Sequence, residues 1–205
     1  MGILPRSFYL RPDVVQIAGD LLGKQLFTRM DGMITSGIIC ETEAYAGTTD
    51  RASHAFDGRR TKRTEVMYAI GGSAYVYLCY GIHSLFNVVT NAAGIPHAVL
   101  IRGIIPAHGR DTMLHRTGKA EITKDFGIGP GKVSGILGIH YSHSGLDLVD
   151  KTQNPKQPAI WIEDAGIKID SGMITTGKRV GVDYAGEDSY RPYHFSVSES
   201  HFDYH

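Results

Sequence analysis

Strand-like alternation of apolar side chains is the feature that most constrains how this 205-residue chain can fold. The alternating runs lie at residues 34–45, 73–91, 96–106 and 159–164. The run at 73–91 contains a predicted tight turn near Tyr80 and Gly81, which indicates two strands joined as a hairpin. Strands outnumber helices. We therefore expect an α+β fold with a curved, mainly antiparallel β-sheet, flanking helices and a protruding β-hairpin.

Two segments have helical features. Apolar residues in the stretch 12–22 recur with the spacing of an amphipathic helix, with Pro12 suited to its first position and Gly23 to its end. A second, weaker pattern predicts a short helix that begins at Pro130. The length of the chain suits one domain, and we assign residues 1–205 to it.

The charge balance restricts the partners that the chain can attract. Its 21 Lys and Arg residues equal its 21 Asp and Glu residues, so there is no global basic field. Binding to nucleic acid would then depend on local basic clusters, on shape and on stacking. The first residues contain no long apolar segment, so we expect a cytoplasmic protein that does not associate with a membrane.

Two glutamates follow the apolar part of the first strand, in the stretch "CETEAYAGTTDRASHAF". Alternation places Glu41, Glu43 and Tyr45 on one face of that strand. The two carboxylates could be a solvated edge, an acid–base pair, or one general base beside a structural neighbour. Arg102 is a lone cation in the apolar row of the strand at 96–106. If Arg102 is buried, it needs a carboxylate partner, and Glu41 or Glu43 is the candidate. Such an ion pair could be purely structural.

Aromatic and basic residues suggest a surface for nucleic acid. Tyr75 and Tyr77 share a strand face, and Tyr80 falls at the predicted hairpin tip, where an exposed ring can stack on bases or enter a duplex. The densest basic cluster lies just before the hairpin, and a second one lies near the end of the chain. Their candidate phosphate-binding residues are Arg59, Arg60, Lys62 and Arg63, and Lys178 and Arg179.

Several motifs of other enzyme classes are incomplete. "GIGPGKVS" lacks the Ser or Thr that follows the lysine of a phosphate loop, because Val133 stands there. The chain has no Cys-x-x-Cys pair, which excludes the zinc site of nucleobase deaminases.

Taken together, these segments resemble the alkyladenine (3-methyladenine) DNA glycosylase family. The similar stretches are "LPRSFY", "DLLGK", "ETEAYAGTTDRASHAF", "RRTKR", "YVYLCYGIHSLFNVV", "AVLIRGIIP", "GPGK" and "RVGVDYAGE". They span nearly the whole chain. The resemblance implies a DNA glycosylase that acts as a monomer on double-stranded DNA containing damaged purines. It implies no metal and no organic cofactor.

The resemblance also implies roles for individual residues. Glu43 is similar to the family's general base, and Arg102 to the arginine that holds the attacking water and the carboxylate. Tyr80, with Gly81 beside it, matches the residue that enters the duplex through the minor groove and fills the gap left by the flipped nucleotide. The flipped base would lie in a pocket formed by Tyr45, His54, Tyr77, Asn87 and Leu100. Asn87 would exclude the 2-amino group of guanine.

The implied reaction is monofunctional. Glu43 would deprotonate a water that attacks the sugar as the N-glycosidic bond of 3-methyladenine, 7-methylguanine, hypoxanthine or ethenoadenine breaks. Two other readings of the residues remain open. One is a carbohydrate hydrolase that uses Glu41 and Glu43, and the other is a nucleic-acid-binding module in which Arg102 and Glu43 form a structural pair.

Overall fold

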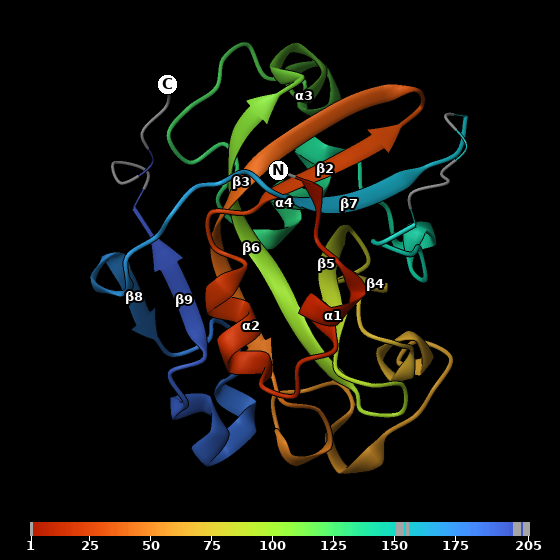
Figure 1. Ribbon diagram of the computed structural model, residues 1–205, viewed down its shortest axis with the longest axis vertical. Helices are drawn as coiled ribbons and strands as arrows, with labels where there is room; N and C mark the ends of the chain where they lie inside the picture. The colour runs from red at the N-terminus through yellow and green to blue at the C-terminus, as the bar shows by residue number, and fades with distance from the viewer. Residues whose placement is uncertain (1, 151–153, 155, 199–201, 203–205) are drawn as a thin grey trace.

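The two longest strands, β3 and β6, lie side by side and organise the sheet, as the computed structural model shows (Figure 1). The structure describes residues 2–150, 154, 156–198 and 202. The sheet follows the order β1-β7-β2-β3-β6-β5-β4, its neighbours run antiparallel, and β9 pairs with both β3 and β8. The strands are β1 (Gly2–Ile3), β2 (Gln25–Met30), β3 (Met33–Tyr45), β4 (Ala74–Cys79), β5 (His83–Thr90), β6 (His97–His108), β7 (Ala159–Asp164), β8 (Ile174–Gly177) and β9 (His194–Val197).

The helices are short and cover the sheet. They are α1 (Arg6–Tyr9), α2 (Val14–Asp20), α3 (Arg110–Thr117) and α4 (Pro130–Leu137). In Figure 1, α2 lies in front of β3 and β6, whereas α4 lies behind the strands. Ile17 and Leu21 contribute fully buried side chains to the core beneath α2. The α+β prediction, with its curved antiparallel sheet and its hairpin, is confirmed. No helix in the described ranges is long and apolar enough to cross a membrane.

The predicted start of the first long helix is wrong. Pro12 lies before the helix, because Asp13 caps it: the Asp13 side chain accepts hydrogen bonds from the backbone N–H groups of Val15 and Gln16. A side-chain acceptor at this position satisfies N–H groups that the first turn leaves without partners, so the helix begins after Asp13. The helix predicted at Pro130 is confirmed as α4.

Strand β3 changes its neighbour halfway along. Its first half pairs with β2, whereas its residues Glu41 to Glu43 pair with β9 on that side. The pairing with β6 is irregular on both sides of Glu41, between Ile39 and Thr42. Because Glu43 has paired strands on both sides, it lies inside the sheet. The polar stretch of sequence around it is nevertheless typical of a surface.

The β4–β5 hairpin projects a tight turn. Both Tyr80 and Gly81 have positive φ angles, 50° and 75°, as hairpin turns with two central left-handed residues require. Glycine adopts this region without cost, but a tyrosine there is strained by roughly 1–2 kcal/mol. The predicted turn is confirmed, and Tyr80 is 91% exposed at its tip.

Gly127 marks a close approach of a loop to β6. Its carbonyl accepts a hydrogen bond from the Ile104 N–H at 3.0 Å, and two residues later the Gly129 N–H donates to the Arg102 carbonyl at 2.8 Å. A Cβ atom at Gly127 would overlap the carbonyl oxygen of Ile104. The loop is therefore held against the part of β6 that carries Arg102.

We expect Gly127→Ala to lower the free energy of unfolding by about 1–3 kcal/mol, because the backbone must shift to admit the methyl group. The matched control is Gly135→Ala in α4, where an added Cβ has no neighbour within 4 Å. This control should stabilise the protein by about 0.5–1 kcal/mol, since alanine is the better helix former. Urea unfolding of both variants tests the pair, and equal effects would contradict the close approach.

Candidate active site

A cavity of about 340 Å³ opens beside the β4–β5 hairpin. Six of the seven residues predicted for catalysis and base binding line it, namely Tyr45, His54, Tyr77, Asn87, Leu100 and Arg102, whereas Glu43 does not. Tyr80 stands at its edge, and the C-terminal segment contributes Val180 and Tyr184. The cavity therefore brings together residues that are far apart in the sequence.

Sheet register explains this gathering. Glu43 on β3 and Asn87 on β5 both face Leu100 on the intervening strand β6. Tyr75 on β4 lies opposite Asn87, whose side-chain amide donates to the Tyr75 carbonyl at 3.2 Å. Three members of this row, Leu100, Asn87 and Tyr75, line the cavity, and backbone hydrogen bonds fix their order.

His54 forms part of the aromatic wall. Its Nδ1 lies 2.9 Å from the Tyr75 hydroxyl, and its ring meets that of Tyr77 edge to face with the centroids 4.6 Å apart. Burial, aided by the nearby charges of Arg63 and Arg59, lowers the pKa of His54 to about 4. The imidazole is therefore neutral at physiological pH and adds no positive charge to the cavity.

Glu43 lies behind the cavity wall with no exposed surface. Its Oε1 accepts from the Val180 N–H at 2.7 Å, and its Oε2 accepts from the Tyr45 hydroxyl at 2.7 Å. Burial and the neighbouring Glu43 carboxylate raise the pKa of Tyr45, so this hydroxyl stays protonated and donates. Two directed hydrogen bonds therefore orient the buried carboxylate.

Arg102 has both glutamates as carboxylate partners. Its Nε lies 3.1 Å from Oε1 of Glu41 and 3.5 Å from Oε1 of Glu43. Glu41 is thus the nearer partner. The same Glu41 oxygen also lies 2.6 Å from Nε2 of His194 on β9.

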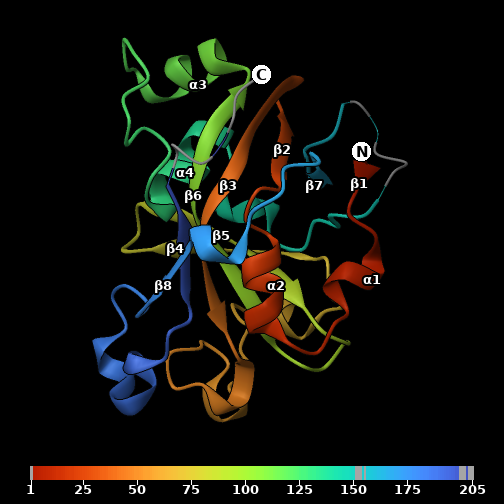
Figure 2. The same cartoon turned by 60° about the vertical axis from the view of Figure 1, so that its left-hand side comes forward.

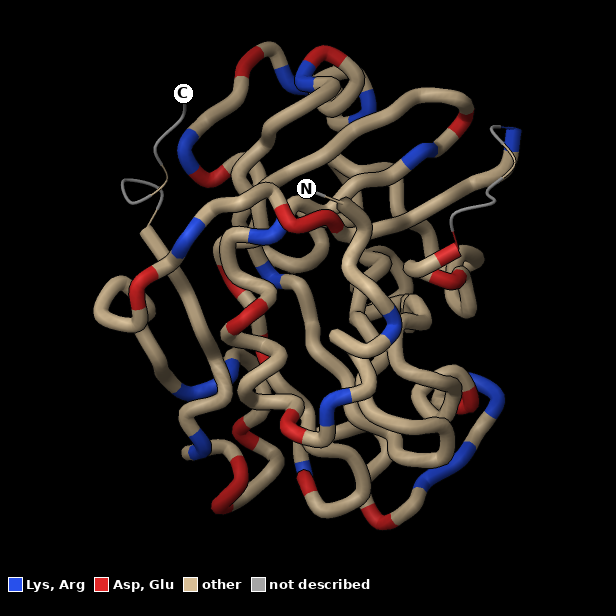
Figure 3. Tube along the Cα trace, viewed as in Figure 1, with Lys and Arg blue, Asp and Glu red and all other residues tan. Residues whose placement is uncertain are grey.

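The first basic cluster is divided among different environments. Figure 3 shows basic residues on the loop at the lower right, which precedes β4 in the chain. Arg59 and Lys62 are exposed there. Arg60 is held by Glu65 at 2.6 Å and lies over the ring of Tyr68.

Arg63, by contrast, turns toward the site. Its guanidinium carbon lies 4.8 Å from the ring centre of Tyr77, and the side chain lines the cavity. Its charge is therefore placed beside the aromatic wall.

Arg179 does not belong to an exposed phosphate-binding surface, and that expectation is corrected. It is 4% exposed, and its Nη2 lies 2.8 Å from Oδ1 of Asp50. It also donates to the carbonyls of Ala44 and Asp188. A buried guanidinium requires such partners, and the sequence pattern "GKR" does not reveal them. Its neighbour Lys178 is exposed, with its Nζ 3.9 Å from the ring centre of Tyr190.

Sequence reasoning missed the contribution of the C-terminal segment. The Val180 N–H donates to Glu43, but a backbone donor leaves no residue-type signal. Tyr184 lines the cavity and donates to the Ala52 carbonyl at 3.2 Å. It lies in the segment "RVGVDYAGE", where the resemblance gives Tyr184 no role. Figures 1 and 2 both show this blue segment beside the orange turns that follow β3. Among the described residues, no three His, Cys, Asp or Glu side chains gather as a metal site.

We expect Arg179→Met to lower the free energy of unfolding by about 3–5 kcal/mol, because it leaves the buried Asp50 carboxylate without its cation. Lys178→Met is the matched control, since it removes an adjacent but exposed charge and should change stability by less than about 0.5 kcal/mol. Thermal and urea unfolding measure both. Similar small effects would show that Arg179 is not a structural cation.

Comparison with known proteins identifies the family. Residues 7–201 match the family described as methylpurine-DNA glycosylase. Relatives named for 3-methyladenine DNA glycosylase occur in Chlamydia felis, at 45% identity over 96% of both chains, and in Chlamydia abortus, at 46% identity over 94% of this chain and 97% of the relative. Another, from Bacillus cereus strain B4264, is 42% identical over 93% of both chains. A family match over most of the chain and full-length relatives point the same way: this chain belongs to the methylpurine-DNA glycosylase family.

Proposed function

We propose that this DNA glycosylase flips alkylated or deaminated purines out of double-stranded DNA and hydrolyses their N-glycosidic bonds as a monomer. The observation that carries the proposal is the buried Glu43 carboxylate, oriented by Tyr45 and Val180 directly behind an aromatic cavity. The cavity volume of about 340 Å³ is near the lower end of the range for small-molecule sites, which suits one purine base. The substrates would be 3-methyladenine, 7-methylguanine, hypoxanthine and ethenoadenine.

The wall residues suit such a base. The neutral ring of His54 adds no charge that would repel a cationic lesion, and the rings of Tyr45 and Tyr77 can stack on a flipped purine. Asn87 lies at the floor with its amide held by the Tyr75 and Leu85 carbonyls. We propose that this fixed amide excludes the 2-amino group of guanine by contact.

The chemical step would use Glu43 as general base. Each of its oxygens accepts one hydrogen bond within the protein and keeps a further lone pair for a water. Because Glu43 is fully buried, we propose that water reaches it through the cavity when the Tyr45 hydroxyl moves away from Oε2. The water attacks C1′ of the sugar, its proton passes to Glu43, and the bond to the base breaks through an oxocarbenium-like state, with the electron pair leaving on the base. A cationic methylpurine thereby leaves as a neutral base, whereas hypoxanthine or ethenoadenine leaves as an anion that takes a proton from solvent. The products are the free base and an abasic site.

Tyr80 would hold the DNA open. It is almost fully exposed in a left-handed backbone conformation, a strain that a glycine at this position would avoid. Ile82, 73% exposed, extends the apolar tip. Apolar side chains that enter the minor groove separate base steps, and we propose that Tyr80 fills the space of the flipped nucleotide. The phosphate backbone of the DNA would be contacted nearby by Gly81, Arg59, Lys62 and Lys178.

The carbohydrate hydrolase reading is less favoured. Glu41 and Glu43 both approach the same nitrogen of Arg102 from one strand, so they do not flank a bond from opposite sides. The binding-module reading is an outcome of the experiment below.

We expect Glu43→Gln to lower the single-turnover excision of hypoxanthine from a labelled duplex by at least about 100-fold, the lower end of general-base contributions. The glutamine keeps the shape of the side chain but cannot take a proton from water, so affinity for the same duplex should be retained. Alkali treatment reveals the abasic site as a strand break. Glu121→Gln, at an exposed position, is the matched control and should excise normally. No excision by the unaltered protein on any lesion would support a binding module instead.

We expect Tyr80→Ala to weaken binding to lesion-containing duplex by about tenfold, because one inserted or stacked aromatic ring contributes roughly 1–3 kcal/mol. Tyr141→Ala removes another exposed tyrosine and serves as the control. Fluorescence of 2-aminopurine next to the lesion reports flipping, and it should fall for Tyr80→Ala alone. Unchanged affinity and flipping would exclude the wedge role.

A further inference from the structure

Glu41 is a partly buried charge that the proposed reaction does not use. Its side chain is 14% exposed, and its Oε1 receives two contacts: His194 Nε2 at 2.6 Å and Arg102 Nε at 3.1 Å. Burial alone would raise the pKa of Glu41, but the hydrogen bonds from His194 and Arg102 outweigh it and lower the pKa. The carboxylate therefore keeps its negative charge at neutral pH.

The backbone is shaped to admit this carboxylate. The irregular pairing of β3 with β6 on both sides of Glu41 turns its side chain toward Arg102. Opposite it stands Gly103, where an added Cβ would lie 2.8 Å from Cβ and 3.0 Å from Oε2 of Glu41. A larger residue at Gly103 would therefore compete with the carboxylate for the same space.

The position of Arg102 between two carboxylates gives Glu41 a functional consequence. Both ion-pair contacts of Arg102 within the described chain use its Nε, and the side chain also lines the cavity. At 3.1 Å against 3.5 Å, the guanidinium is drawn toward Glu41 and away from Glu43. A cation in full contact with Glu43 would stabilise its ionised form and weaken it as a proton acceptor.

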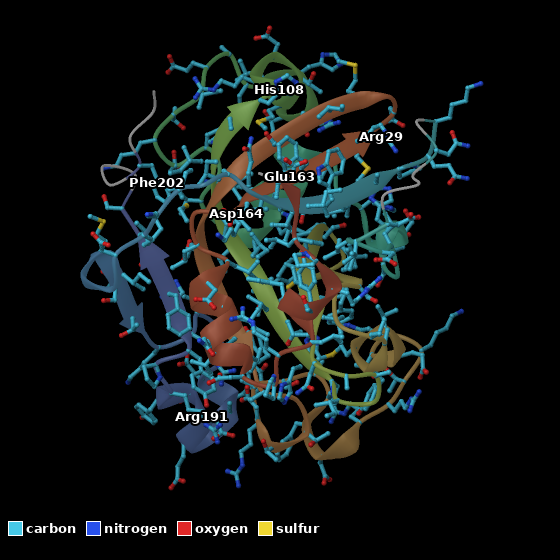
Figure 4. The ribbon with its side chains drawn as sticks, in the orientation of Figure 1. Arg29, His108, Glu163, Asp164, Arg191 and Phe202 are labelled. Carbon is cyan, nitrogen blue, oxygen red and sulfur yellow. The ribbon has the colours of Figure 1, made fainter. Side chains whose placement is uncertain are left out.

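The C-terminal segment completes the arrangement. His194 on β9 supports Glu41, and the Val180 N–H from the turn after β8 supports Glu43. Figure 4 labels Arg191 in the same segment, where it pairs with Asp188 at 2.7 Å. The two glutamates are thus held from one side by one continuous piece of chain.

We propose that Glu41, supported by His194, is a positioning residue that holds Arg102 toward the cavity and limits its pairing with Glu43. This inference rests on the proposed function, because it assigns Glu43 as the base. Removing the charge of Glu41 would let Arg102 close on Glu43. The titratable groups that contact or influence the two glutamates are Tyr45, Arg102, Arg179, Tyr184 and His194.

The test is single-turnover excision of hypoxanthine by Glu41→Gln from pH 4 to 9, with duplex affinity and thermal unfolding measured in parallel. We expect the plateau rate to fall by about tenfold, with duplex affinity within about twofold of the unaltered protein. The acid limb of the rate profile should move to lower pH, since a closer cation lowers the pKa of a carboxyl group. A purely structural role would not move this limb.

Two His194 variants keep the inference testable if Glu41→Gln folds poorly. His194→Gln retains an N–H donor and should keep most of the rate, whereas His194→Leu should show the lower rate and the shifted limb. Two outcomes in Glu41→Gln would overturn this inference: an unchanged rate and acid limb, or losses of rate, affinity and melting temperature without a shifted limb. If the unaltered protein excises and Glu43→Gln does not, the proposed function still stands. Inactivity of the unaltered protein on every lesion would overturn both proposals.

Discussion

The rest of the site depends on one constraint: a carboxylate that is fully buried must find hydrogen-bond donors. Glu43 has none on the neighbouring positions of its own strand except the Tyr45 hydroxyl, so the second donor comes from the Val180 N–H, 137 residues away in sequence. An unpartnered buried charge would cost several kcal/mol or more, so the hydrogen bond from the C-terminal segment offsets part of the cost of burying Glu43. The catalytic proposal and the closure of the fold thus use the same contact.

A buried ion pair between Arg179 and Asp50 lies next to the hydrogen bond between Val180 and Glu43. Arg179 immediately precedes Val180, and its pairing with Asp50 fixes the turn that presents the Val180 N–H. Asp50 also accepts from the Ala46 and Ala52 N–H groups, so it ties down the loop that leads from Tyr45 to His54. One buried pair therefore anchors both sides of the cavity entrance. Because desolvation of the two charges offsets much of their attraction, the main effect of the pair is to position these two segments and not to add net stability.

The sequence predicted the parts of the molecule that follow from periodicity. Strand β3, the β4–β5 hairpin, β6, β7 and α4 were predictable because their apolar runs are long or their turn residues are distinctive. The four-residue strands β8 and β9 were not, since "ITTG" and "HFSV" carry little hydrophobic pattern and form only against partners. In the site, the resemblance supplied residues that the structure places in one cavity. It could not reveal Arg179 as buried, because a solvated and a paired arginine look the same in sequence.

Several of the cations are paired within the protein, and this bears on how it would bind DNA. Arg102, Arg179 and Arg60 are each paired with a carboxylate, so these three cations are not fully available to phosphates. The chain as a whole is neutral, which removes the long-range attraction that many DNA-binding proteins have. Non-specific affinity would then be modest. Recognition would rest on the exposed Tyr80 tip and on a cavity in which the histidine is neutral, so discrimination is left to shape, stacking and hydrogen bonding of the flipped base.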